Sequence, residues 1–249
     1  MDIMAKMKIN RKFMKNKNSK NAFTIIEFLI ALCIIFIAIA GIFFVKKIIK
    51  ENNVKSLIMQ IKKYDAALNN FTQKYQALPG DLKSTVTYGI TEYSTDGNND
   101  NIITDRVQQI LMANGEITKF WLHLSKTKMI DENYDGKDDS DAKNGSTFPL
   151  SKIGENSGIA VFGNEGKTFY QIGFKFADTD RLYTNNRSLK SEEAFLFDRK
   201  MDDGNPQKGR IIAVGGDMLN VPTNEECVKL GEYNQSTISP VCQLRIEAR

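Results

Sequence analysis

The stretch NAFTIIEFLIALCIIFIAIAGIFFVKK, residues 21–47, combines a membrane-length apolar run with one carboxylate near its start. Residues 28–45 carry no charged side chain and are rich in Ile, Leu, Phe and Ala. The length of this run is enough for a helix to span a bilayer. Glu27 directly precedes this run, and an acid at membrane depth usually has a partner or a function. The sequence therefore predicts a transmembrane helix with a functional acid at its start.

The charge of the chain is divided unevenly between its first residues and the rest. Residues 1–22 hold seven Lys and Arg and one Asp, whereas residues 23–249 hold 27 basic and 29 acidic side chains, a net charge of −2. A basic segment before an apolar run is the cytoplasmic flank of a membrane span. A body with a net charge of −2 does not favour nucleic acid as a partner.

Beyond the apolar run, a helical pattern continues without interruption to the LPGD sequence at residues 78–81. The apolar residues recur at spacings of three and four: Val54, Leu57, Ile58, Ile61, Tyr64, Leu68, Phe71, Tyr75 and Leu78. The pattern predicts one helix over residues 23–78, about 80 Å long at about 1.5 Å per residue. Its first half is apolar all round, and its second half is apolar along one stripe that needs a globular partner.

The N-terminal residues K-N-A-F-T-I-I-E-F-L-I-A-L resemble the start of type IV prepilins and type II secretion pseudopilins. In that family a basic leader ends in Gly and is followed by Phe-Thr-Leu-Ile-Glu and an apolar helix. Phe23 then matches the first mature residue, Thr24 the second and Glu27 the acid at the fifth. Ala22 stands where the family has Gly, so this position departs from the pattern.

The resemblance implies a processing route and a set of partners. A prepilin peptidase would cut between Ala22 and Phe23 on the cytoplasmic face and methylate the Phe23 amine. The mature helix would then assemble with other pilin or pseudopilin subunits on an inner-membrane assembly platform. Cleavage creates an α-amine in the membrane, and Glu27 of a neighbouring subunit could neutralise it, because a buried charge is costly when it is alone.

The remainder of the chain, residues 79–249, predicts an α+β head. Strand-like runs occur at 158–165, 167–177 and 209–216, and helical patterns at 104–113, 116–130 and 191–206. We expect a small antiparallel sheet packed against the long helix, followed by a tail that Cys227 and Cys242 tie together. The domains are thus a leader (1–22), a long helix (23–78) whose transmembrane half is 23–45, and a periplasmic or extracellular head (79–249). In that oxidising compartment the two cysteines would form a disulfide.

Two acidic loops are candidates for calcium, since their Asp and Asn residues have the spacing of calcium-loop ligands. The candidate ligands are Asp131, Asn133, Asp135 and Asp138 in one loop and Asp96, Asn98 and Asp100 in the other. The first loop fits the pattern better because Gly136 occupies the turn position. The alternative is two solvated acidic turns without metal, since Asp, Asn and Gly also favour turns.

The sequence contains no motif of a catalytic site, and we expect no enzymatic activity. Its only histidine, His123, lies among core residues of a predicted helix. The expected function is therefore that of a minor pilin or pseudopilin of a type IV pilus or type II secretion system, anchored once in the bacterial inner membrane. Two alternatives stay open: an unprocessed, membrane-anchored calcium-binding or adhesive ectodomain, and a DNA-uptake pseudopilin.

Overall fold

The computed structural model describes residues 24–90, 96–104, 112–174, 187–214 and 226–249. The chain divides into two compact units, Met1–Lys46 and Lys47–Arg249. The helices are α1 (Ile25–Tyr75), α2 (Glu116–Lys126) and α3 (Ser191–Met201), with short 3-10 helices η1 (Thr85–Tyr88) and η2 (Asp139–Asp141). The strands are β1 (Gly158–Asn164), β2 (Lys167–Phe174), β3 (Leu189–Lys190), β4 (Ile211–Val214), β5 (Val228–Lys229), β6 (Glu232–Tyr233) and β7 (Pro240–Glu247). The leader, Ala22 and Phe23 lie outside the described residues.

Helix α1 follows the predicted apolar pattern but ends three residues before the predicted Leu78. Gln76 adopts a left-handed conformation with φ of 54°, which an ordinary helix cannot continue through. Its backbone N–H still donates to the carbonyl of Thr72 at 2.9 Å, so it closes the last turn. The helix therefore stops before Pro79, and the LPGD sequence that predicted the stop begins just beyond it.

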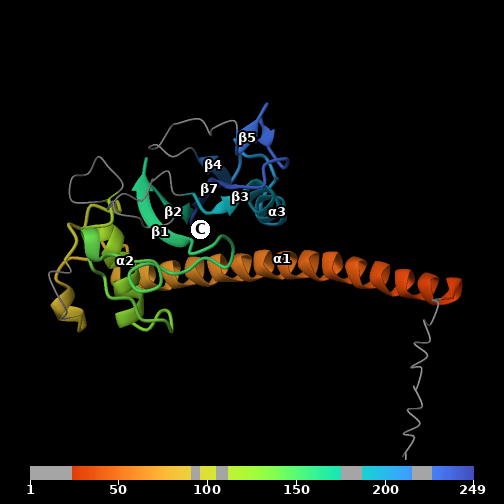
Figure 1. Ribbon diagram of the computed structural model, residues 1–249. Helices are drawn as coiled ribbons and strands as arrows, with labels where there is room; N and C mark the ends of the chain where they lie inside the picture. Colours follow the sequence, from red (N-terminus) through yellow and green to blue (C-terminus); the bar gives the residue numbers. More distant parts are fainter. Residues whose placement is uncertain (1–23, 91–95, 105–111, 175–186, 215–225) are drawn as a thin grey trace, which may run out of the picture. The chain divides into compact units, whose positions relative to one another are not determined.

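The head contains an antiparallel sheet whose strands follow the order β1-β2-β7-β3, with β4 also paired to β7 (Figure 1). Strands β1 and β2 form a hairpin in which Val161 lies opposite Tyr170. The C-terminal strand β7 is the centre of the sheet: Leu244 lies opposite both Ile172 of β2 and Ala213 of β4. The last residues of the chain are thus the part of the sheet with the most strand partners.

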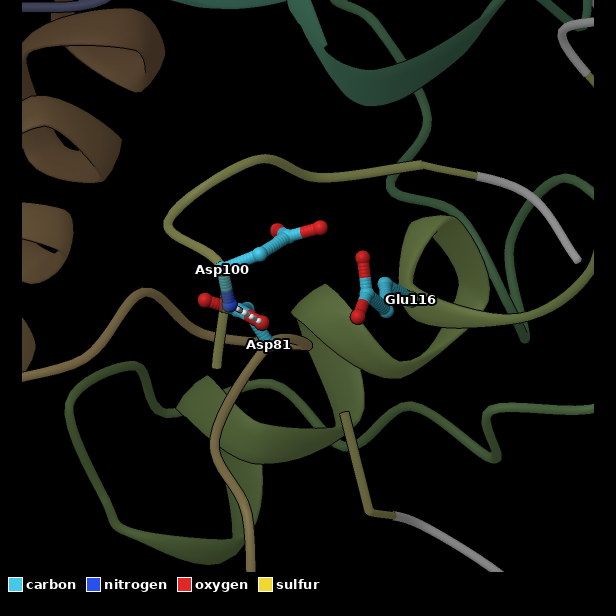
Figure 2. Close-up of side chains that lie close together, drawn as sticks. All are labelled: Asp81, Asp100 and Glu116. Atoms are coloured by element: carbon cyan, nitrogen blue, oxygen red, sulfur yellow. Dashed lines mark hydrogen bonds between the residues drawn. The ribbon is translucent and has the colours of Figure 1, made fainter. Parts of the chain in front are cut away.

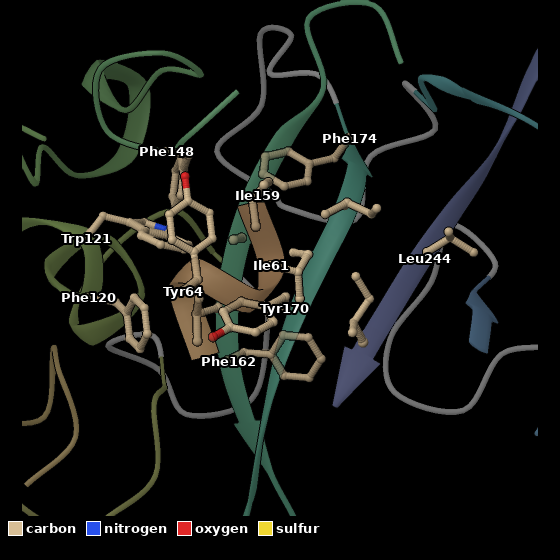
Figure 3. Close-up of a cluster of buried hydrophobic side chains, with 14 of the residues drawn as sticks. Ile61, Tyr64, Phe120, Trp121, Phe148, Ile159, Phe162, Tyr170, Phe174 and Leu244 are labelled. Atoms are coloured by element: carbon tan, nitrogen blue, oxygen red, sulfur yellow. The ribbon is translucent and has the colours of Figure 1, made fainter. Parts of the chain in front are cut away.

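The second half of α1 packs against this sheet and against α2 to form the core of the head (Figure 3). Tyr64 of α1 meets Trp121 of α2 with ring centroids 4.6 Å apart, and Trp121 lies 6.4 Å from Tyr170 of β2. All three side chains are buried, as is Ile61 one turn earlier on α1. Burying aromatic and branched side chains of this size supplies most of the stability of such a fold.

The α+β architecture predicted from the sequence is confirmed. The predicted runs at 158–165, 167–177 and 209–216 contain β1, β2 and β4, and the predicted helices at 116–130 and 191–206 contain α2 and α3. The predicted helix at 104–113 lies mostly outside the described residues. The tail was predicted only as a disulfide-tied segment, and that prediction missed β7.

Candidate assembly site and candidate calcium loops

The first turn of α1 holds a reciprocal pair of hydrogen bonds between Thr24 and Glu27. Oε2 of Glu27 accepts from the backbone N–H and from the hydroxyl of Thr24, both at 2.8 Å. The backbone N–H of Glu27 in turn donates to Oγ1 of Thr24 at 3.3 Å. This is a capping box, in which the residue before the helix and the third helical residue satisfy each other's backbone donors.

The capping box gives Glu27 a role within its own chain that our sequence interpretation did not consider. The signal was present, because Thr-x-x-Glu before an apolar run is the usual sequence of this motif. The two hydrogen bonds that the Glu27 side chain accepts both use Oε2. None of the described residues donates to Oε1 of this exposed side chain. One carboxylate oxygen therefore remains available to a donor from outside the chain.

The helical turns that follow Glu27 expose large apolar side chains on every face. Up to Lys46, the exposed fraction of such side chains ranges from 47% at Ile39 to 83% at Ile25. The apolar stretch is long enough to cross a membrane, and none of it is buried within the chain. An exposed apolar surface of this extent needs lipid or other helices around it.

One of the two predicted calcium loops does bring carboxylates together, but with partners that the sequence did not suggest. Asp100 lies beside Asp81, which follows α1, and beside Glu116, the first residue of α2 (Figure 2). One oxygen of each carboxylate lies within 4.8 Å of the others. Asp96 instead accepts from the backbone N–H and hydroxyl of Thr85 at 2.7 and 2.8 Å.

Asp81 and Glu116 hold the loop through its backbone. Asp81 accepts from the N–H groups of Asp100 at 3.1 Å and Asn101 at 2.8 Å, and Glu116 from those of Asn98 and Thr104, both at 3.0 Å. Burial raises the pKa of both carboxyls, and the negative charge of Asp100 raises the pKa of each further. A divalent cation at this cluster would relieve that repulsion, so Asp81, Asp100 and Glu116 are the described residues of this loop region that could hold one.

The loop over residues 131–141 is arranged differently, because its predicted ligands point to separate partners. Asp131 pairs with Lys63 of α1 at 3.1 Å, and Asp135 accepts from the hydroxyl of Thr147 at 2.7 Å. Asp138 pairs with the ammonium of Lys119, and Asn133 is exposed. Among the described residues, these carboxylates do not form a group of three close enough to hold a metal ion.

A lysine ammonium occupies the inner side of this loop. Lys119 of α2 is 7% exposed, and its Nζ donates to the backbone carbonyl of Gly136 and, at 3.1 Å, to Oδ1 of Asp138. A carbonyl and a carboxylate converging on one point are the ligands that calcium would use. In this loop the ammonium of Lys119 occupies the position that a calcium ion would take. This contact could not be predicted from the sequence, because Lys119 and Gly136 are 17 residues apart along the chain.

A third group of acids, which the sequence interpretation missed, lies at the end of α3. Asp198 is buried and accepts from the hydroxyl of Tyr233 at 2.8 Å and from the N–H of Gly204 at 3.1 Å. Burial raises the pKa of Asp198 to about 6, and the nearby charges of Asp202 and Asp203 act in the same direction. The contacts tie α3 to β6 and to the loop that leads into β4.

Two further predictions can be compared with the structure directly. Cys227 and Cys242 form a disulfide, which joins the start of the β5–β6 hairpin to β7 and confirms the predicted pairing. His123 is fully buried on α2, as predicted, and its Nδ1 accepts from the backbone N–H of Gly80 at 2.8 Å. Its position is structural: it holds the turn after α1 against α2.

Comparison with protein-family models, with curated proteins and with solved structures finds no match for the chain. What the molecule does show is an N-terminal helix with an exposed apolar first half, and a second half packed on an antiparallel sheet with a C-terminal disulfide. This architecture is pilin-like.

Proposed function

We propose that the chain is a structural subunit of a type IV pilus or type II secretion pseudopilus. The observation that carries the proposal is the Thr24–Glu27 pair at the start of an exposed, membrane-length apolar helix. The capping box uses only Oε2 of Glu27, and a carboxylate at this depth whose other oxygen has no donor calls for a partner. The size of the head, over residues 79–249, favours a minor pilin or pseudopilin over a bulk subunit.

In this proposal a prepilin peptidase cuts between Ala22 and Phe23 and methylates the new amine. The amine is then a positive charge within one turn of Glu27. Oε2 of Glu27 continues to cap its own helix, while Oε1 accepts from the Phe23 amine of the neighbouring subunit. The pair stabilises the assembly mainly because either charge alone would be costly in the membrane, and it therefore fixes the axial stagger of the subunits.

The proposed location follows from the charges that flank the helix. The basic leader stays in the cytoplasm, the helix spans the inner membrane once, and the head lies in the periplasm. The disulfide between Cys227 and Cys242 supports an oxidising compartment for the head. The proposed role is assembly without catalysis, and the partners are other pilin-like subunits, the peptidase and the assembly platform.

The experiment that tests the charge pair compares Glu27→Gln with Glu27→Ala in the full-length chain. Gln can still accept the hydrogen bonds of the capping box, but it carries no charge. We expect both variants to be cleaved and neither to enter filaments, measured as the sheared or sedimentable fraction of the protein. If Glu27→Gln assembled like the unsubstituted chain while Glu27→Ala did not, Glu27 would act only as a cap, and the charge pair would be wrong.

A further inference from the structure

The exposed face of α1 along the head carries positive charge without negative charge. The exposed residues between Asn52 and Lys74 include four lysines, at 55, 62, 63 and 74, and otherwise Asn, Gln, Ala and Met. We call this face the lysine strip. Surface helices usually intersperse acids among such lysines, because oppositely charged residues three or four positions apart stabilise a helix. The lysine strip has no such pairs on its exposed positions.

The two acids of this part of α1 form ion pairs with residues outside the lysine strip. Glu51 pairs with Lys200 of α3 at 3.7 Å, and Asp65 pairs with Arg210 at 2.6 Å in a mostly buried contact. Among the described residues, no acid lies within ion-pair distance of Lys55 or Lys62. These two lysines are seven residues apart, so they lie on the same line of the helix, about 10 Å from each other.

An acidic surface lies directly beside the lysine strip. Asp131 and Glu132, which we call the acidic edge, reach Lys63 at the border of the strip with distances of 3.1 and 3.0 Å. The side chain of Asp131 is nevertheless 96% exposed. Residues 131–141 contain six acids and one lysine, and the buried Lys119 clamps this loop against α2. Lys63 thus contacts the acidic edge, Lys119 holds the loop that follows it, and the side chain of Asp131 stays exposed to a partner.

We propose that the acidic edge of one copy of this chain binds Lys55 and Lys62 in the lysine strip of a second copy. The proposal rests on the filament function proposed above and names the contact between its subunits. The two surfaces are different patches of one molecule, so the contact is heterologous, and each copy keeps one free patch for a further neighbour in an open filament. Each ion pair contributes little, but their arrangement selects the partner and the register of packing.

Cross-linking between two differently tagged copies of the full-length chain tests the contact. One copy carries Lys62→Cys and the other Asp131→Cys, both with Cys33→Ser, and they are expressed together and oxidised in the membrane. Different tags make the cross-link intermolecular, although Asp131 also lies near α1 of its own chain. The matched control pairs Lys62→Cys with Glu165→Cys, an exposed acid in the β1–β2 turn.

We expect the mixed-tag dimer to form several times more efficiently with Asp131→Cys than with Glu165→Cys, and to decrease at high salt or with Lys55→Glu. Equal cross-linking in both pairs, or none in either, would overturn the contact. If methylated Phe23 is the mature N-terminus and no cross-link forms, the contact is wrong and the proposed function stands. A specific cross-link in protein that retains its leader would support the contact and overturn the filament function.

Discussion

At the first turn of α1, Thr24 takes up one oxygen of Glu27 and leaves the other without a described donor. From the sequence, we interpreted Glu27 only as an acid that pairs with an amine in the membrane, although Thr-x-x-Glu also predicts a capping box. The hydrogen bonds show that the same acid also stabilises the start of its helix, which is a property of an isolated subunit. Both roles are compatible, because they use different oxygens, and the Glu27→Gln variant separates them.

Asp198 gives a second prediction at the scale of one residue. Its pKa of about 6 in the folded chain lies above the ordinary value of 3.8, so folding takes up a proton between these values. The stabilisation is complete below the unfolded value and is lost as the pH rises through about 6. We expect the free energy of unfolding to fall by about 1 kcal/mol from this group between about pH 5 and pH 7.5.

The measurement compares urea unfolding of the full-length chain in detergent with that of Asp198→Asn at both pH values. Asn can still accept from Gly204 and donate to Tyr233, but it does not titrate. The other raised carboxyls, Asp81 and Glu116, are present in both proteins and cancel in the difference. An identical pH dependence of the two proteins would show that Asp198 does not have the raised pKa.

Helices and strands could be predicted where the pattern that determines them lies within their own sequence. Helix α1 was predicted within a few residues because its apolar spacing runs over many turns. Strand β7 was missed, although Cys242, Leu244 and Ile246 alternate with Val241, Gln243 and Arg245 in its sequence PVCQLRIE. The polar residues of the second set, Gln243 and Arg245, are buried in the structure. Their burial depends on packing around the sheet, which the sequence of the strand does not reveal.

The loop over residues 131–141 also depends on a residue from another element. The spacing of its acids predicted a bound cation. The structure fills that position with the ammonium of Lys119. We expect Lys119→Met to lower the free energy of unfolding by about 2–3 kcal/mol, because Gly136 and Asp138 lose a buried charged donor. Lys137→Met, in the exposed part of the same loop, should change it by less than about 0.5 kcal/mol. Equal effects in chemical denaturation would contradict the role of Lys119.

Calcium binding stays a prediction, and the structure changes which loop we favour. Asp100 lies with Asp81 and Glu116, whereas the loop of Asp131 already holds Lys119. We expect calcium, compared with a chelator, to raise the melting temperature of the unsubstituted chain. At about 100 times the dissociation constant the gain is about 2.7 kcal/mol.

Asp100→Asn should abolish that gain, and Asp131→Asn should leave it unchanged. Asp100 is exposed and suited to this test, since its substitution removes no buried acceptor. A melting temperature that does not respond to calcium would contradict the prediction. A gain that disappears with Asp131→Asn instead would restore the loop over residues 131–141 as the site.

At the scale of the whole molecule, the chain joins a unit with exposed apolar side chains to a unit with an ordinary folded core. The general architecture could be predicted because it follows from patterns that extend over many residues: a basic leader, an apolar run and an amphipathic continuation. The cluster at Asp81 could not, since it brings together residues from separate elements. The acids around Asp198 are neighbours in the chain, but the contact of Asp198 with Tyr233 of β6 could not be predicted from their sequence. The residues on which the proposed function depends most, Ala22 and Phe23, precede the described part of the chain.

Mass spectrometry of the N-terminus of the full-length gene product, isolated from membranes, tests whether the chain is processed as a pilin-like subunit. We expect the mature chain to begin at Phe23 with a methylated α-amine, despite Ala22 at the position where the family has Gly. A chain that begins at Met1 or Met4 would contradict the proposed function, because no amine would then lie within one turn of Glu27.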